Sequence, residues 1–193
     1  MPTDEDLFRD WQRGEARALE ALVERYHAPL IAHLYRVLAD VHLAEDLTQE
    51  TFIRLIRDAQ SYRYPRPFRP WLYAIAHHLA CNHHASAYAR RIELRAELPQ
   101  EASSEHDPIE WLERWERHHG LHKALAHLSI EQREVLSLRF GQELSIQETA
   151  TILAIPPGTV KSRTFHALRL LRAYLNEEEA NPAANRQGET HHG

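Results

Sequence analysis

Residues 145–163 read SIQETATILAIPPGTVKSR, and this stretch decides the fold class. Ser145 and Glu148 have the spacing of a capping box, in which each side chain accepts a hydrogen bond from the other residue's backbone N–H at the start of a helix. The segment Ala154-Ile-Pro-Pro-Gly158 then predicts a tight connection, because proline cannot continue a helix. A short helix, a tight turn and a longer helix form the layout of a helix-turn-helix.

The helix predicted after this turn separates an apolar face from a polar face. At about 100° per residue, the apolar side collects Val160, Thr164, Leu168, Leu171 and Leu175. The other side carries Lys161, Ser162, Phe165, His166, Arg169 and Arg172. Basic side chains bind phosphate oxygens and guanine edges, and phenylalanine packs against a thymine methyl group. We interpret the helix as a DNA-recognition helix; an ordinary amphipathic helix with a solvated basic face is the alternative.

The rest of the chain also has helical rather than strand periodicity. A second capping box, Ser129 to Gln132, begins a helix upstream, and Asp107-Pro108-Ile109-Glu110 has the pattern of a helix start. Residues 97–107 are acidic and contain no apolar periodicity, as in a flexible linker. We expect an all-α protein with two small helical domains. The predicted boundaries are 1–92 for the first domain, 93–107 for the linker, 108–175 for the second domain and 176–193 for a disordered tail.

A helix predicted over residues 43–59 carries charges on the side opposite its apolar face. Its core side collects Thr48, Phe52, Leu55, Ile56 and Ala59. Its outer side collects Asp46, Glu50, Arg54, Arg57 and Asp58, with Leu47 among them and Ile53 at the margin. An exposed leucine within a charged rim is typical of the centre of a protein interface, although single exposed apolar side chains are also ordinary.

The helix predicted from Trp71 has a second stripe beside its buried residues, formed by Trp71, His78 and Asn82. The preceding loop alternates aromatic and basic residues, namely Tyr62, Arg63, Tyr64, Arg66, Phe68 and Arg69. Aromatic rings stack on unpaired bases while arginines follow the backbone, so this loop suits single-stranded nucleic acid. A loop that anchors itself to the core with its aromatic rings fits equally well.

Composition limits the possible classes of function. The chain has 193 residues, a net charge of −5 and one cysteine, Cys81, so its fold does not depend on an internal disulfide. The acidic start and the lack of a long apolar run predict a cytoplasmic protein with no membrane insertion. We find no phosphate-binding glycine loop and no nucleophile elbow, and expect neither catalysis nor a cofactor.

One histidine-rich helix face is a candidate for metal binding. His77, Cys81 and His84 are spaced i, i+4 and i+7, so a continuous helix projects all three from one side, which we expect to point away from the core. Imidazole and thiolate are suitable ligands for zinc, nickel or cobalt. We favour a solvated face over a metal site, and this face is also a candidate surface for a protein partner.

Four stretches resemble the sigma-70 family of RNA polymerase sigma factors. Residues 43–52, LAEDLTQETF, are similar to the region 2 helix that binds the polymerase clamp, and residues 68–76, FRPWLYAIA, to the segment that melts and reads the −10 element. Residues 128–139, LSIEQREVLSLR, and 158–163, GTVKSR, resemble region 4, whose helix-turn-helix reads the −35 element. Only regions 2 and 4 fit in the chain, which is the pattern of the extracytoplasmic-function (ECF) group.

The resemblance implies roles for individual residues. Those matching the polymerase-binding motif are Asp46, Leu47, Gln49 and Glu50. Residues expected at the −10 element are Tyr62, Arg63, Trp71, His78 and Asn82. Residues expected at the −35 element are Arg139, Thr159, Lys161, Ser162, Phe165, His166, Arg169 and Arg172.

The resemblance also implies partners: core RNA polymerase, promoter DNA and a controlling anti-sigma factor, which in this group is often membrane-bound. The acidic net charge then has an explanation, because the polymerase holds the DNA and this subunit adds a few base contacts. A stand-alone helix-turn-helix regulator is the alternative, and it predicts duplex binding without polymerase.

Overall fold

The computed structural model describes residues 2–93 and 124–180, and every regular element in these two stretches is helical. The first stretch contains α1 (Asp4–Gln12), α2 (Ala16–Leu38), α3 (Val41–Arg57), the 3₁₀ turn η1 (Ala59–Ser61) and α4 (Phe68–Glu93). The second contains α7 (Ile130–Leu136), the π-helical turn η2 (Ser137–Gly141), α8 (Ile146–Leu153) and α9 (Pro157–Ala180). The predicted all-α class is confirmed for these residues.

Local hydrogen bonds set the helix starts, and the two predicted capping boxes lie where the sequence places them, whereas the helix predicted over residues 43–59 is α3, from Val41 to Arg57. Both capping boxes form, with Ser129 and Ser145 each accepting from the backbone N–H three residues on. Asp40 caps α3 by accepting a 3.0 Å hydrogen bond from the Leu43 backbone. The predicted end at residue 175 is too early, since α9 continues to Ala180. Residues 94–123 and 181–193, which include most of the expected linker, the helix start at Asp107 and most of the expected tail, lie outside the described residues.

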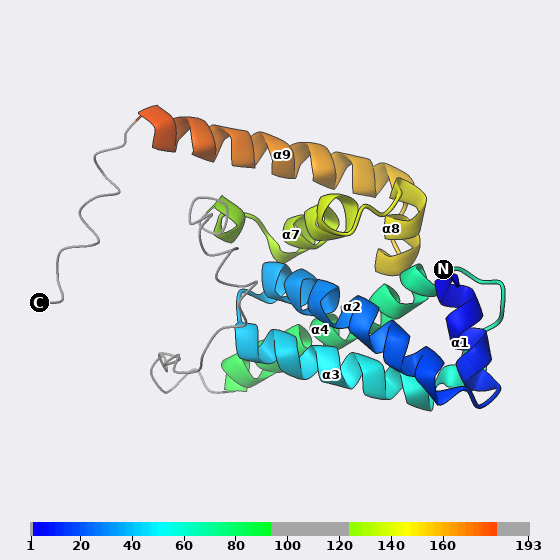
Figure 1. The fold of residues 1–193 in the computed structure, drawn as a ribbon. Helices are drawn as coiled ribbons and strands as arrows, with labels where there is room; N and C mark the ends of the chain where they lie inside the picture. The colour runs from blue at the N-terminus through cyan, green and yellow to red at the C-terminus, as the bar shows by residue number, and fades with distance from the viewer. Residues whose placement is uncertain (1, 94–123, 181–193) are drawn as a thin grey trace, which may run out of the picture.

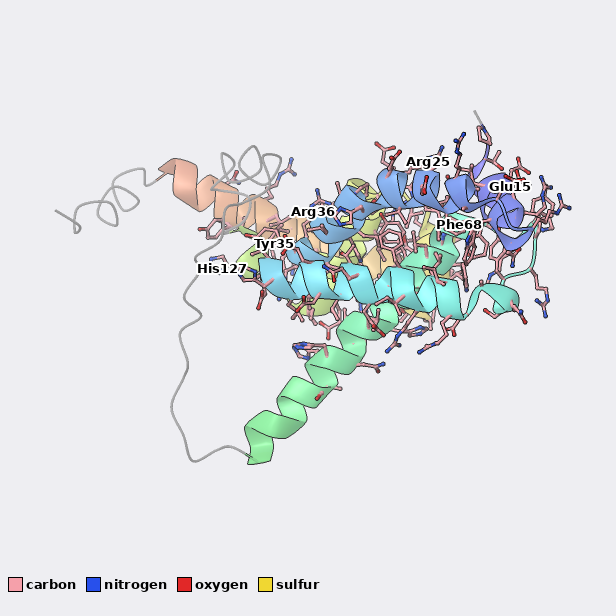
Figure 2. The ribbon with its side chains drawn as sticks, turned by 60° about the horizontal axis from the view of Figure 1, so that its bottom comes forward. Glu15, Arg25, Tyr35, Arg36, Phe68 and His127 are labelled. Atoms are coloured by element: carbon pink, nitrogen blue, oxygen red, sulfur yellow. The ribbon has the colours of Figure 1, made fainter. Side chains whose placement is uncertain are left out.

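The first stretch forms a bundle in which α2 packs against α1, α3 and α4. Its interior holds the fully buried side chains Leu30, Leu34, Leu72 and Tyr73. Phe8 of α1 lies at the centre of an aromatic cluster, with its ring centroid 4.9 Å from that of Tyr62 and 5.1 Å from that of Phe68. Figure 2 shows Phe68 at the end of the bundle near α1, whereas Tyr35 and Arg36 lie toward the opposite end of α2.

The second stretch packs on the first rather than standing apart from it. Figure 1 shows α7, α8 and α9 along one side of α2, with α3 on the other side. Helix α8 contacts α4, whereas α7 and η2 contact α2. Side chains of both stretches, among them Leu34, Leu72, Leu138 and Leu153, belong to one continuous apolar cluster.

Within residues 2–93 and 124–180, none of the helices has the length and hydropathy needed to cross a lipid bilayer.

Candidate nucleic-acid and protein interfaces

Helix α3 presents a polar outer face, but its apolar members differ from the predicted ones. Asp46 and Gln49 are exposed, and Glu50 is half-buried and pairs with Arg54 at 2.8 Å. Leu47, which the sequence placed on this face, is only 9% exposed and belongs to the core. The prediction of an exposed Leu47 is therefore wrong. Because α3 packs against both α2 and α4, its buried arc is wider than one helical face and includes this leucine.

Two isoleucines occupy the outer face instead. Ile53 is 57% exposed and Ile56 is 46% exposed. The sequence had assigned Ile56 to the core, and this assignment is also wrong, whereas Thr48, Phe52 and Leu55 are buried as predicted. Ile53 and Ile56 lie one helical turn apart among Asp46, Gln49 and Arg57 on the projection of α3, so they form the apolar centre of this surface. In the sequence, both isoleucines lie close to charged residues. This was the available signal that they face solvent.

Two of the residues expected to contact the −10 element are covered. Tyr62 is 2% exposed and Trp71 is also buried, and their ring centroids lie 5.1 Å apart beneath Phe8. The Tyr62 hydroxyl donates to the backbone carbonyl of Arg66, and burial, helped by the nearby Glu5 carboxylate, raises the pKa of Tyr62 to about 12. For Tyr62 and Phe68 the anchoring interpretation of the loop is confirmed, because these rings have no face open to a base.

The other three residues of this set are accessible. His78 and Asn82 are exposed one turn apart on α4, and Arg63 is exposed in the loop. Tyr64 is the one large aromatic of this loop with an exposed ring, and the guanidinium of Arg9 lies 4.5 Å from its centroid. Arg9 belongs to α1, so the loop sequence alone did not predict its contact with the Tyr64 ring.

The helix-turn-helix is formed as predicted. Helix α8 ends at Leu153, its C-cap residue Ala154 adopts a left-handed conformation with φ of 52°, and α9 begins at Pro157. Lys161, Ser162, His166, Arg169 and Arg172 are exposed on α9, and Phe165 is 64% exposed. Ser162 donates a 3.1 Å hydrogen bond to the Thr159 carbonyl, which holds its side chain at the start of the helix.

Three details of α9 and its surroundings differ from a simple amphipathic pattern. Leu168 is 44% exposed, so its assignment to the buried stripe is wrong, and Ala167 is fully buried in its place. The small Ala167 side chain allows α9 to approach α7 closely.

The last two residues expected at the −35 element are less accessible or engaged elsewhere. Thr159 is half-buried, and Arg139 lies on η2, where its guanidinium donates to the Leu144 carbonyl. Arg139 therefore supports the turn before α8.

The histidine-rich face of α4 lies against the second domain rather than against solvent alone. The Nδ1 atom of His77 contacts Glu134 of α7, and the Cys81 sulfur lies 3.7 Å from the His77 ring nitrogens. These residues and His84 line a cavity of about 310 Å³ that Glu131 and Glu134 also line. Burial and these two carboxylates raise the pKa of the Cys81 thiol. Among the residues with described positions, no three His, Cys, Asp or Glu side chains are arranged to hold a metal ion.

The helix-turn-helix of α8 and α9, with basic side chains exposed on α9, has the layout of a DNA-binding transcription protein. Residues 22–91 match the family described as Sigma-70 region 2, and residues 124–173 match Sigma-70, region 4. The chain belongs to the sigma-70 family of RNA polymerase sigma factors, in its ECF group.

Characterised relatives cover most of the chain. It is 32% identical over 173 residues to the RNA polymerase sigma-H factor of Pseudomonas aeruginosa, covering 85% of this chain and 89% of that one. It is 31% identical over 174 residues to the ECF RNA polymerase sigma factor BldN of Streptomyces coelicolor, covering 90% of this chain and 66% of that one.

Solved structures share the fold at lower sequence identity. CnrH, in complex with the cytosolic domain of CnrY, superposes with a TM-score of 0.68 at 23% identity over 91% of this chain and 98% of that one. The sigma factor RpoE of Bartonella quintana, in complex with the anti-sigma factor NepR, superposes with a TM-score of 0.65 at 23% identity over 81% of this chain and 96% of that one.

Proposed function

We propose that the outer face of α3 binds core RNA polymerase, and that α4 and α9 then direct the enzyme to the −10 and −35 elements of its promoters. The observation that carries this assignment is the recognition helix. Phe165, Lys161 and Ser162 project into solvent from α9 directly after the capped α8 and its left-handed turn. A single exposed apolar side chain is ordinary, but an exposed phenylalanine beside basic residues at the start of a helix-turn-helix recognition helix has the side chains that base-edge contacts use.

The polymerase contact centres on Ile53 and Ile56, with Asp46, Gln49 and Glu50 around them. An apolar centre inside a polar rim is the usual anatomy of a transient protein interface. Leu47 supports this surface from beneath, since its side chain packs in the core.

At the −10 element, His78 and Asn82 on α4 and Arg63 in the loop provide the accessible contacts, and Tyr64 offers a ring for base stacking. Tyr62 and Trp71 are buried beneath these residues, with their rings in contact. These two rings reach DNA only if α1 moves away from them, because Phe8 covers both.

An anti-sigma factor is the expected regulator. CnrH and RpoE, which share this fold, were solved in complexes with CnrY and NepR respectively. A cavity of about 310 Å³ between η2 and α9 is lined by the exposed Phe140 and Leu168 and by Arg133, which suits an apolar segment with acidic flanks. We expect this regulator to be anchored in the membrane, while the sigma factor itself acts in the cytoplasm with the polymerase.

Transcription in vitro tests the proposed function. RNA sequencing after overproduction of the protein identifies candidate promoters, and run-off reactions with purified core enzyme then measure initiation from them. We expect transcripts only when both the chain and core enzyme are present. A gel shift with and without core enzyme separates the alternative, because a stand-alone regulator binds its duplex without polymerase.

A further inference from the structure

Helix α1 contacts the loop between α3 and α4 at both ends of that loop. The Gln12 side chain donates a 2.7 Å hydrogen bond to the Ala59 carbonyl in η1. The Glu5 carboxylate accepts a 2.9 Å hydrogen bond from the backbone N–H of Phe68, the first residue of α4. These two bonds hold the ends of the loop relative to α1. The stretch that matches Sigma-70 region 2 begins at residue 22, so α1 lies outside it.

Aromatic packing keeps α1 on the bundle. The Phe8 ring is fully buried, and its centroid lies 4.9 Å from that of Tyr62 and 5.3 Å from that of Trp71. At the start of α1, Asp4 accepts a hydrogen bond from the Tyr26 hydroxyl of α2. An aromatic ring has a large apolar area, so removal of α1 would expose Phe8 and the two rings beneath it to water. With α1 in place those two rings stay covered, and an unpaired base needs another aromatic partner.

Tyr64 is held by α1 but keeps an open ring. The guanidinium of Arg9 lies 4.5 Å from the Tyr64 ring centroid, which is a cation–π contact, and Tyr64 is 48% exposed. Arg9 is itself fixed by Asp6, whose carboxylate lies 2.8 Å from a guanidinium nitrogen. The pKa of Asp6 is lowered by hydrogen bonds from Thr3, by Arg9 and, to a smaller extent, by a hydrogen bond from the Tyr64 hydroxyl. Helix α1 therefore contacts both the face and the hydroxyl of Tyr64.

The charges around Tyr64 give the nearby arginines different roles. Arg9 lies 2.8 and 3.6 Å from two carboxylates of α1, so its charge is balanced within its own helix. Arg63 and Arg66 are exposed in the loop on either side of Tyr64. In single-stranded nucleic-acid sites, cations follow the phosphates while bases stack on rings. Arg63 and Arg66 are suited to the phosphates, and Arg9 to positioning the ring.

A ring held in one orientation binds a base better than a freely rotating ring. A base that stacks on a mobile side chain must also immobilise it, and the lost rotamer freedom weakens binding. Arg9 already restricts Tyr64 in the free protein, so this cost is smaller. In duplex DNA each base stacks on its neighbours, so Tyr64 gains a stacking partner only where the strands have separated.

We propose that Tyr64, positioned by Arg9, stacks on an unpaired base of the melted −10 element, and that α1 is thereby part of the promoter-reading site. The proposal rests on the proposed function. It assigns the stacking role to Tyr64 in place of Tyr62, because Phe8 of α1 covers Tyr62. Arg9 does not touch the base and acts through the Tyr64 ring.

Binding to fork-junction DNA tests the proposal in the holoenzyme reconstituted from the full chain and core polymerase. The probe is a promoter that gives run-off transcripts, with a duplex −35 element and an unpaired non-template strand across the −10 element. Each base of the unpaired strand is replaced in turn by an abasic site, and fluorescence anisotropy measures the affinity. We expect Tyr64→Ala to weaken binding to the intact probe by about 5- to 150-fold, the range for loss of one stacked base. Tyr64→Trp should bind tightly, because the larger ring also stacks.

The abasic probes separate a stacking contact from a general disturbance of the loop. On the probe that lacks the contacted base, Tyr64→Ala should cause no further loss of affinity, whereas on the other abasic probes the loss should persist. Arg9→Ala should weaken binding to the intact probe by about two- to fivefold, with no effect on that abasic probe or in the Tyr64→Ala background. Arg9→Lys keeps a cation over the ring and should bind nearly as well as the unsubstituted chain. Arg17→Ala removes the same charge from an exposed position of α2 and is the matched control.

Three results would overturn the proposal. If Tyr64→Ala binds the intact probe as tightly as the unsubstituted chain, the base stacks elsewhere. If Tyr64→Ala weakens binding equally on every abasic probe, the substitution has disturbed the loop rather than removed a stacking contact. If Arg9→Ala weakens binding equally on the intact and abasic probes, Arg9 does not act through Tyr64. If core enzyme with the unsubstituted chain binds the intact probe no more tightly than core enzyme alone, the proposed function itself is contradicted, and the stacking role falls with it.

Discussion

The Tyr73 hydroxyl donates a buried hydrogen bond to the side-chain carbonyl of Gln142, which lies in the other domain. Removal of one partner leaves the other buried and unpaired, which costs about 1–3 kcal/mol. We expect Gln142→Ala to raise the rate of hydrogen exchange at the backbone amides of η2 by about 5- to 150-fold, through more frequent domain separation. Gln147→Ala, the same substitution at an exposed position of α8, is the matched control. Exchange in the Gln142 variant as slow as in the control would show that the hydrogen bond contributes nothing to docking.

Polymerase binding depends on the exposed isoleucines of α3. Ile53→Arg introduces a charge at the centre of the proposed contact, and we expect at least a tenfold weaker association with core enzyme, or about 1.4 kcal/mol. The thermal unfolding midpoint of the Ile53→Arg variant should stay close to that of the unsubstituted protein, because most of the Ile53 side chain is exposed to solvent. Biolayer interferometry with immobilised core enzyme measures the association.

A matched pair of variants separates binding from folding in this experiment. Ala126→Arg adds the same charge at an exposed position of the second domain and should leave the association unchanged. Leu47→Ala removes a buried side chain and should lower the free energy of unfolding by about 2–5 kcal/mol. If Ile53→Arg binds core enzyme normally, this face of α3 is not the polymerase contact.

Promoter choice should depend on the first turns of α9. Replacing Ser162 or Phe165 with alanine should change the ranking of promoters, since loss of a base contact alters discrimination by about 1–3 kcal/mol. Arg172→Ala should instead weaken all promoters by a similar factor and reduce the salt slope by about 1, as expected for a phosphate contact. Parallel run-off reactions on several promoters at two salt concentrations measure both effects. An unaltered ranking in both the Ser162 and Phe165 variants argues against α9 as the reader.

Acidification should weaken domain docking through His33. Arg36 lies on the same helix, Tyr73 and His77 face His33 from α4, and Ser137 faces it from η2. Burial, with a smaller effect of Arg36 and His77, lowers the pKa of His33 from 6.5 to about 3. Domain separation returns the imidazole to water and its pKa toward 6.5, so the separated state binds the proton more tightly. This contribution to docking is fully present above pH 6.5 and declines as the pH falls from 6.5 toward 3.

Small-angle scattering between pH 7.5 and 5.5 measures this dependence. One pH unit below 6.5, the docking equilibrium should shift by about tenfold toward separation, or about 1.4 kcal/mol. The chain contains 15 histidines, so the informative quantity is the difference from His33→Asn, which keeps a polar group near Ser137 but does not titrate. If the scattering of the two proteins changes identically with pH, His33 does not control the pH dependence of docking.

The sequence by itself determined the features that depend on local hydrogen bonds. The capping residues Ser129 and Ser145 begin their helices as the spacing predicts, and the turn before Pro157 forms as its composition requires. A capping bond joins atoms within three residues, so its energy scarcely depends on the rest of the fold. Most of the polar face of α9 follows for a similar reason, because helical periodicity alone decides which side chains share a side.

Only the tertiary structure decided which apolar side chains face solvent and where the second domain lies. Leu47 is buried and Ile56 exposed because α3 has neighbours on two sides, which a single-helix projection does not include. Tyr62 and Trp71 are covered by Phe8, from a helix about sixty residues away in sequence. The bond between Tyr73 and Gln142 requires two surfaces with matched shapes and matched polar groups. Such complementarity is a property of packed surfaces in three dimensions, and no local pattern in the chain encodes it.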